Sequence, residues 1–560
     1  MNSNTNFPLR VSAFICGLLL LSSAQSAAPP GHACATAHPL ATQTCMQVLD
    51  DGGNAFDAAV AASAALAVVE PTGSGIGGGG FWLLHRARDG FEVFVDGRET
   101  APAAAHADMY LGANGQADPL RSRDGALAAA IPGEPAALVH IAREYGSKPL
   151  AELLAPAIAY ARDGFAIDRK LAEAIERHLP RLSGAAPAVF APQGRPLGEG
   201  ERLRQVDLAW TLERLARDGH AGFYDGEVAQ RLLRAAQQAG GIWTATDLRR
   251  YAVVEREPLI AYFRDCRIVT SPPPSAGGVA MAQVFHQLEV LGWQDDGSLR
   301  SQHLFVETLR RAYRDRAFWL GDPDFVSMPL AQLTGRSHAV RLAASIDARR
   351  ATPSSSLPPA LPTSEGSDTT HVSVLDADGN RVAATLSINL PFGSGYMAPG
   401  TGVLFNDEMD DFAVQVGAPN AYGLVGTAAN AIAPHKRPLS SMTPSFVEGP
   451  RGLLLIGTPG GSRIITMVIQ GILAWIGGAD AQTLVARPRL HHQYLPDIVQ
   501  LEAGYADAQR QAELRALGHG LTVLEPWGNL QVVSWDVRAG TLEAASDPRG
   551  VGAAQVRLHD

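Results

Sequence analysis

The pentapeptide Asp368-Thr369-Thr370-His371-Val372 constrains this chain more than any other stretch. It places Thr369 at the first residue of a predicted strand, directly after the Pro- and Ser-rich residues 352–367. A threonine hydroxyl is a weak nucleophile unless a base lies beside it, and cleavage before Thr369 would supply that base as a free α-amine. Because an α-amine titrates at about pH 8, it can accept a proton near neutral pH. We therefore predict a self-processing hydrolase or transferase with Thr369 as nucleophile and Asp368-Thr369 as the cleavage site; the alternative is an ordinary strand that begins with two threonines.

The first residues follow the order of a secretory signal peptide. Arg10 precedes an apolar run at 11–21, and the small residues of 22–28 come next. The run is shorter than the roughly 20 residues that span a bilayer. We predict a signal peptide over 1–27 and a periplasmic or secreted protein with no stable membrane span after signal removal. An uncleaved membrane anchor is the alternative.

The composition limits the classes of partner. With 560 residues, of which 46% are hydrophobic, the chain can bury a large core. Its net charge of −10, without a basic patch, argues against nucleic-acid binding. Cys34 and Cys45 could close a short loop in an oxidising compartment, but the sequence does not establish the bond. Cys266 is predicted to be buried in a strand, and no cysteine or histidine spacing is typical of a zinc site.

A glycine-rich loop near the start suggests close packing. An Ala/Val-rich run at 55–69 predicts a buried helix, and the glycines of 75–80 lead from it into a short strand at 81–84. No Lys-Ser/Thr pair follows these glycines, and a helix precedes them where a nucleotide-binding loop would have a strand. Close approach of the backbone is therefore favoured over nucleotide binding. Further amphipathic helices are predicted over 151–161, 210–217 and 304–319.

A hairpin signal, Ala377-Asp378-Gly379-Asn380, separates the strand of Thr369 from the next strand. If the loop consists of residues 378–380, Thr369 lies opposite Asn389, and Ser387 lies two residues away on the same face. A two-residue loop would turn Ser387 to the other face. A catalytic role for Ser387 therefore requires the three-residue loop.

Five further runs accompany the threonine segment in a fixed order. Together they resemble the γ-glutamyltransferase (glutathione hydrolase) family over essentially the whole mature chain. The resemblance implies an α+β fold, the four-layer αββα sandwich of N-terminal-nucleophile hydrolases, formed jointly by two subunits from one precursor. The subunits would be residues 28–368, with a mobile end at about 352–367, and the catalytic residues 369–560. The five runs are Gly75-Ile76-Gly77-Gly78-Gly79-Gly80-Phe81, Asp96-Gly97-Arg98-Glu99, Asn406-Asp407-Glu408-Met409-Asp410-Asp411-Phe412, Lys436-Arg437-Pro438-Leu439-Ser440-Ser441-Met442 and Gly457-Thr458-Pro459-Gly460-Gly461-Ser462-Arg463.

The resemblance also assigns catalytic roles. Thr369 would act as nucleophile and, after cleavage, as base, while the Ser387 hydroxyl would hydrogen-bond its Oγ. The family commonly has threonine at the position of Ser387, so a methyl group is lost there and the hydroxyl is kept. Gly460 and Gly461 precede a predicted helix and would offer backbone amides to an oxyanion. An ordinary tight turn is the alternative for these glycines.

A γ-glutamyl group ends in an α-carboxylate and an α-ammonium, so its pocket must present both polarities. The resemblance assigns the carboxylate to Arg98, Ser440 and Ser441, because arginine can bind it with two hydrogen bonds. It assigns the ammonium to Asn389, Glu408 and Asp411. Tyr422 falls where many members have a lid loop over the pocket. Simpler interpretations are a surface pair of Arg98 with Asp96 or Glu99 and a solvated acidic turn at 408–411.

The implied reaction has two stages and requires no metal or organic cofactor. Thr369 first attacks the carbonyl of Asp368, and the two resulting subunits stay associated as a heterodimer. Thr369 then attacks the γ-glutamyl amide of glutathione or a related compound and passes the glutamyl group to water, an amino acid or a dipeptide. One alternative is a cephalosporin or glutaryl acylase of the same fold, whose substrate lacks the α-ammonium. The other is an unprocessed periplasmic γ-glutamyl-binding protein without activity.

Overall fold

The computed structural model describes residues 28–357, 369–415 and 427–559. The predicted signal peptide, Asp368 and Tyr422 therefore lie outside the described residues.

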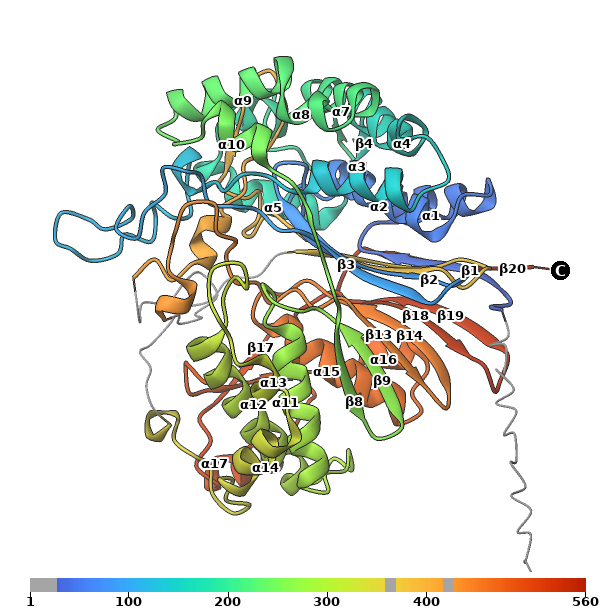
Figure 1. The fold of residues 1–560 in the computed structure, drawn as a ribbon, viewed down its shortest axis with the longest axis vertical. Coiled ribbons are helices and arrows are strands. Elements are labelled where there is room, and N and C mark those ends of the chain that lie inside the picture. The colour runs from blue at the N-terminus through green and yellow to red at the C-terminus, as the bar shows by residue number, and fades with distance from the viewer. Residues whose placement is uncertain (1–27, 358–368, 416–426, 560) are drawn as a thin grey trace, which may run out of the picture.

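Two antiparallel sheets lie face to face at the centre of the molecule (Figure 1). The first has seven strands, in the spatial order β20 (Ala553–Leu558), β1 (Gly31–Thr36), β10 (Thr370–Leu375), β11 (Arg381–Ser387), β2 (Gly79–Arg86), β3 (Phe91–Gly97) and β7 (Val254–Arg256). The second has six, in the order β19 (Thr541–Ser546), β18 (Gln531–Asp536), β14 (Gly452–Gly457), β13 (Ser445–Gly449), β9 (Cys266–Thr270) and β8 (Leu259–Phe263).

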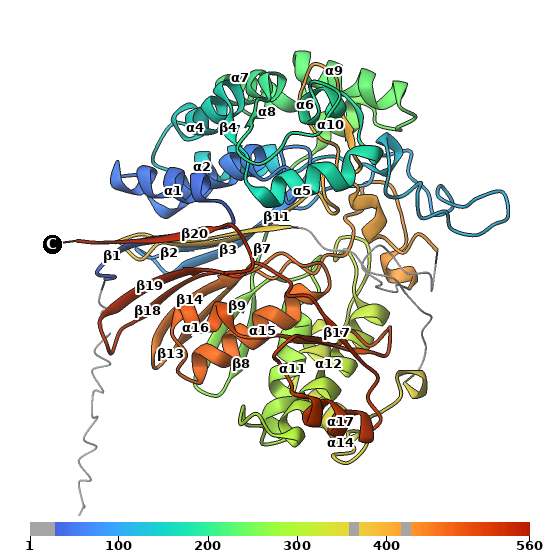
Figure 2. The same cartoon turned by 180° about the vertical axis from the view of Figure 1, so that it is seen from behind.

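Helices cover the outer face of each sheet, as both views show (Figures 1 and 2). The resulting four layers confirm the predicted αββα sandwich. The seven-stranded sheet is covered by a group that includes α1 (Pro39–Asp50), α2 (Ala55–Val69), α3 (Glu134–Glu144), α4 (Leu150–Asp163), α5 (Arg169–His178), α7 (Val206–Asp218), α8 (His220–Tyr224), α9 (Gly226–Gln238) and α10 (Ala245–Arg250). The group on the other side includes α11 (Gly277–Val290), α12 (Leu299–Trp319), α13 (Leu330–Leu333), α14 (Arg336–Ala344), α15 (Arg463–Ile476), α16 (Ala481–Ala486) and α17 (Ala508–Ala516).

The central strands are buried on both faces. In β2, Trp82 and Leu84 pack into the core under α2, whereas Phe81 and Leu83 belong to the core that includes the second sheet. This alternation follows from the two-residue period of a strand. Helix α2 has the bounds predicted from its Ala/Val run, and all of its residues are buried. Asn54 fixes its start by accepting hydrogen bonds from the backbone of Phe56 and Asp57.

Strands from both sides of the predicted cleavage site alternate in the seven-stranded sheet. Strands β10 and β11, which follow the site, lie between β1 and β2, which precede it. All of the pairs between them are antiparallel. Neither predicted subunit can therefore complete this sheet alone.

The β10–β11 hairpin corrects the predicted register. Thr370 pairs with Leu386, so Thr369 lies next to Ser387 and not opposite Asn389. The loop has three residues, as predicted, but occupies 377–379, since Asp376 N donates to Asn380 O at 3.0 Å. The Asp376 carboxylate accepts hydrogen bonds from the backbone amides of Asp378 and Asn380, at 3.1 and 2.9 Å. These bonds favour a loop that lies one residue earlier in the chain than predicted. Ser387 nevertheless shares the face of Thr369, as the catalytic assignment requires.

The positions of the cysteines agree with what the sequence predicted or left open. Cys34 in β1 and Cys45 in α1 form a disulfide, which settles the pairing that the sequence left open. Cys266 is buried in β9, as predicted. Within the described part of the chain, no helix is both long and apolar enough to cross a membrane.

Candidate active site

Thr369 and Ser387 meet at one end of the central strands. Thr369 directly precedes β10 and is only 5% exposed. Its Oγ1 lies 3.4 Å from Oγ of Ser387, the last residue of β11. Ser387 Oγ also accepts a hydrogen bond from the backbone amide of Asn389 at 2.9 Å. The sequence-predicted pair of hydroxyls is thus brought together in a buried setting.

Glycines allow the backbone to close around this pair. A Cβ on Gly78 would lie 2.1 Å from the carbonyl oxygen of Ser387, and one on Gly77 would lie 1.9 Å from that of Leu404. Side chains at these positions would push the strand ends apart. The glycine-rich run therefore serves close backbone packing, as predicted, and holds the end of β11 in place.

Gly460 and Gly461 form the turn before α15. Their φ values of +136° and +55° are those that glycine adopts readily. Neither backbone amide donates a hydrogen bond to any residue that the structure describes. Both glycines line cavities that Thr369 also lines. Unsatisfied amides beside a nucleophile are suited to stabilise an oxyanion.

One small cavity gathers most of the predicted substrate residues, and we call it the acyl pocket. Its volume of about 20 Å³ has room for roughly one water molecule. Glu408 does not line this cavity but is bonded to Arg98, which does. Gly460 lines the adjoining cavity. The acyl pocket is lined by Arg98, Arg316, Thr369, Ser387, Asn389, Asp411, Ser440, Ser441, Met442, Gly461, Ser462 and Ile464.

Arg98 binds the acids that were predicted to hold the ammonium. Its Nη1 lies 2.5 Å from a carboxylate oxygen of Glu408 and 3.5 Å from one of Glu99, and its Nη2 is hydrogen-bonded to Asp411. Arg98, Glu99 and Glu408 are almost completely buried. The interpretations of a surface arginine and a solvated acidic turn are therefore wrong. The two predicted halves of the pocket are ion-paired to each other.

This burial changes the proton affinities. Desolvation, opposed by Arg98 and reinforced by Asp411, raises the pKa of Glu408 to about 7. Desolvation and the charge of Glu408 also raise the pKa of Glu99 well above its usual range. Desolvation opposes the positive charge of Arg98, but its carboxylate neighbours outweigh that effect and raise its pKa. Arg98 therefore stays protonated among acids that compete for it.

Asn389 and Ser440 are fixed by the backbone around them. Asn389 has a φ of +75°, and its side-chain amide donates to the carbonyl oxygen of Asp407 at 3.0 Å. The side-chain oxygen of Asn389 is a hydrogen-bond acceptor, as the binding of an ammonium group requires. Ser440 Oγ accepts from the amide of Met442 at 3.1 Å, and Ser440 N donates to the Pro274 carbonyl.

Arg316 is a pocket residue that the sequence interpretation missed. It lies on α12, is 4% exposed, and donates through Nη2 to Ser441 Oγ at 3.2 Å. Desolvation lowers its pKa to about 10. A sequence signal existed, because Arg316 continues the apolar stripe of Phe305, Leu309 and Ala312 at helical spacing. A charged residue on such a stripe marks a buried functional position.

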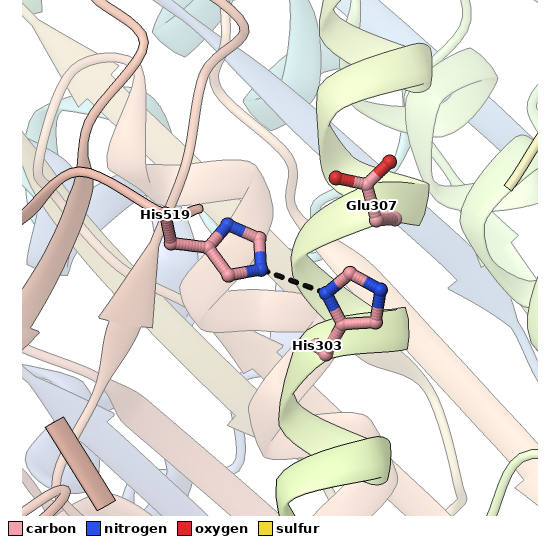
Figure 3. A group of neighbouring side chains, drawn as sticks. All are labelled: His303, Glu307 and His519. Atoms are coloured by element: carbon pink, nitrogen blue, oxygen red, sulfur yellow. Dashed lines mark hydrogen bonds between the residues drawn. The ribbon is translucent and has the colours of Figure 1, made fainter. Parts of the chain in front are cut away.

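A second group of buried ionisable residues lies on α12. Figure 3 shows His303 and Glu307 on this helix with His519 opposite. His303 Nδ1 and His519 Nε2 are 2.8 Å apart and share a hydrogen bond. Glu307 accepts hydrogen bonds from Arg310 and Arg311, at 3.2 and 2.6 Å. Although these residue types can bind metals, the two histidines bond each other and two arginines balance the carboxylate, so we assign the group to holding α12 in place.

The chain before the predicted cleavage site is anchored next to this group. Thr352 N donates to Glu307 at 3.1 Å, and Ser354 N donates to Asp497 at 2.7 Å. Tyr494 donates its hydroxyl hydrogen to the Leu357 carbonyl at 2.8 Å. Residues 352–357 are thus tied to both predicted subunits, which differs from a mobile segment starting at 352. The rest of that predicted segment lies outside the described residues.

Comparisons with known proteins agree with this arrangement. A family model described as gamma-glutamyltranspeptidase matches residues 41–556. The chain is 40% identical over 542 residues to the glutathione hydrolase proenzyme of Pseudomonas sp. (strain A14), covering 95% of this chain and 94% of that protein. It is also 40% identical over 520 residues to the proenzyme of Escherichia coli (strain K12), covering 91% and 89%.

Solved structures show the same relationship. Cephalosporin acylase from Bacillus halodurans has a TM-score of 0.82 at 26% identity and covers 99% of both chains. Helicobacter pylori gamma-glutamyltranspeptidase has a TM-score of 0.55 at 38% identity and covers 57% of this chain and 93% of its own.

Proposed function

Because the chain belongs to the γ-glutamyltranspeptidase family, we propose that it is a self-processing hydrolase and transferase of γ-glutamyl compounds, with glutathione as a substrate. The observation that carries the proposal is the placing of Thr369 beside the Ser387 hydroxyl and two uncommitted glycine amides. These are a nucleophile, its hydrogen-bond partner and an oxyanion site in one place.

Maturation would use the same hydroxyl. Thr369 Oγ attacks the carbonyl carbon of Asp368, and the peptide nitrogen leaves as the α-amine of Thr369, which gives an ester. Water then cleaves this ester, so that residues 28–368 end in a carboxylate and residues 369–560 begin with a free amine. The word proenzyme in the relatives' names supports this step. The alternation of strands in the seven-stranded sheet supports a heterodimer that persists after cleavage.

In turnover, Thr369 Oγ attacks the γ-amide carbon of the substrate while the α-amine of Thr369 accepts the hydroxyl proton. The amides of Gly460 and Gly461 stabilise the oxyanion, and the protonated amine of cysteinylglycine leaves. The γ-glutamyl ester then reacts with water to give glutamate, or with the amine of an amino acid or dipeptide to give a new γ-glutamyl amide.

The ion pairs of the acyl pocket favour a γ-glutamyl over a glutaryl substrate. A γ-glutamyl group brings one carboxylate for Arg98 and one ammonium for Glu408 and Asp411, so it exchanges one set of ion pairs for another. A glutaryl group brings only the carboxylate and would leave the two acids without their arginine. A buried charge that loses its partner costs about 3–5 kcal/mol. This favours the transpeptidase over the acylase, despite the acylase-like fold.

The remaining features of the proposal concern location and partners. A periplasmic or secreted enzyme accords with the signal-like residues 1–27 and with the Cys34–Cys45 disulfide, since disulfides persist in oxidising compartments. The small-molecule partners are γ-glutamyl donors and amine acceptors, and Tyr422 is proposed to belong to a lid over the pocket.

N-terminal sequencing of the purified protein, combined with assays on γ-glutamyl-p-nitroanilide and glutaryl-p-nitroanilide, tests the proposal. We expect two polypeptides, one beginning at Thr369, and faster turnover of the γ-glutamyl substrate. Thr369→Ala should stay a single chain and be inactive. Active protein that is a single chain would refute the role of Thr369. Faster glutaryl turnover would instead identify an acylase, and a single inactive wild-type chain would identify the binding protein.

A further inference from the structure

A second cavity adjoins the nucleophile, and we call it the outer cavity. Its volume is about 350 Å³, much larger than the acyl pocket. Thr369 lines both cavities, whereas Gly460 lines the outer cavity and Gly461 the acyl pocket. The nucleophile and the oxyanion glycines therefore form the boundary between the two spaces. A substrate amide cleaved at this boundary has its acyl part on one side and its amine part on the other.

We propose that the outer cavity binds the amine part of the substrate and the acceptor, and that Arg177 recognises their free carboxylate. This inference rests on the proposed function, because it concerns the second half of the same reaction. Its ligands are peptides or amino acids with a free C-terminal carboxylate, such as the cysteinylglycine part of glutathione. A volume of this size is within the usual range for small-molecule sites.

Helix α5 supplies the charged wall of the outer cavity. Lys170, Glu173 and Arg177 line it from positions spaced by three and four residues. This spacing places the three side chains on one face of the helix, while Ile175 is buried on another. Asp168, at the N-cap, accepts a hydrogen bond from Leu171 N at 3.0 Å and fixes the start of α5.

Two of these three charged side chains, Lys170 and Glu173, already have a partner within the protein. Lys170 Nζ donates to the carbonyl oxygen of Arg549. Glu173 is paired with Arg169 at 3.7 Å. Arg177 makes no hydrogen bond and no ion pair with the residues that the structure describes, although it lines the cavity. It is therefore the guanidinium available to a ligand.

The position of Arg177 fits the chemistry of the amine part. The reacting nitrogen must lie at Thr369, which is buried, whereas Arg177 lines the same cavity and is exposed to solvent. In an extended dipeptide the carboxylate lies roughly 7 Å from the amine, so it points away from the nucleophile. A guanidinium can bind a carboxylate with two parallel hydrogen bonds. The outer cavity thus selects acceptors and leaving groups by their C-terminal charge.

The test compares glutathione with glutathione whose glycine carboxylate is amidated. Glutamate release gives kcat/KM for each compound, and the readout is the ratio of the two. We expect wild-type enzyme to prefer glutathione, and Arg177→Gln to reduce the ratio by about five- to tenfold, the effect of losing one charge-assisted contact. Arg177→Glu should invert the preference. Arg217→Gln is the matched control, because Arg217 is exposed and neither it nor its ion-pair partner Asp218 lines the cavity.

The outcomes separate this inference from the function on which it rests. If the wild-type enzyme does not hydrolyse γ-glutamyl-p-nitroanilide, the proposed function is refuted and this inference with it. If it does, but Arg177→Gln keeps the wild-type ratio or the wild-type ratio is already one, the inference alone is wrong. In the transfer reaction, a parallel loss of preference for glycylglycine over glycylglycinamide would support it.

Discussion

Replacement of Arg316 by methionine should stabilise the protein and weaken substrate binding. Arg316 is buried in the acyl pocket and bonds Ser441, but it forms no ion pair with the residues that the structure describes. Desolvation lowers its pKa from the usual value of an arginine to about 10, which corresponds to about 3 kcal/mol of destabilisation. Because neutral pH lies below both values, the whole cost is present there, and it would shrink only as the pH rises through about 10.

Methionine has a similar length without the charge, so Arg316→Met should raise the free energy of unfolding by about 1–3 kcal/mol. It should also remove a cation that lines the acyl pocket beside Ser441 and lower kcat/KM by about 10- to 100-fold, mainly through KM. Stability is measured by denaturant unfolding in the Thr369→Ala background, which keeps one chain. Kinetics are measured with γ-glutamyl-p-nitroanilide in the processed enzyme.

Arg311→Met is the matched control on the same helix. Arg311 is equally buried but donates to Glu307 at 2.6 Å, so its loss should destabilise the protein by about 3 kcal/mol. The two variants should change the free energy of unfolding in opposite directions, because Arg311 has an acidic partner and Arg316 forms no ion pair with the described residues. A less stable Arg316→Met protein with unchanged KM would show that Arg316 only supports the loop of Ser441.

Three further predictions concern pH, the second hydroxyl and the disulfide. Because burial raises the pKa of Glu408 to about 7 and an ammonium requires its ionised form, kcat/KM should fall below about pH 7, and Glu408→Gln should flatten this limb of the pH profile. Ser387→Ala should slow acylation in single-turnover assays by about tenfold through loss of the hydroxyl contact, whereas activity retained in Ser387→Ala but lost in Ser387→Thr would contradict this role. Cys45→Ser should cost about 2–3 kcal/mol in unfolding experiments at unchanged KM, and an unchanged unfolding midpoint would show that the disulfide is not needed for stability.

Local features of the fold were predictable from the sequence. Helix α2 begins after Asn54, whose side chain caps it, and both the cap and the Ala/Val run are visible in the sequence. The hairpin loop was placed one position too late because the Asp376 carboxylate binds two backbone amides of the turn. That choice depends on one side-chain conformation, which residue propensities do not encode.

Long-range pairings within the site were not predictable in the same way. The family resemblance named Arg98, Glu408 and Asp411, yet it assigned them to opposite ends of a ligand. Their ion pairs join residues 310 and 313 positions apart, so no local pattern reveals them. Arg316 was missed for the opposite reason, since its helical spacing was visible but its proximity to Ser441 depends on how α12 packs.

The alternation of β1, β10, β11 and β2 dictates the order in which this molecule can be made. If the two parts were synthesised as separate polypeptides, the β10–β11 hairpin would need to insert between strands whose edges had already met, or else wait with both edges unpaired and prone to aggregate. One continuous translation product avoids this difficulty, because every strand can pair before any peptide bond is cut. Scission at the proposed site would then work as a quality check, since only a correctly assembled chain would acquire the free α-amine that serves as its base.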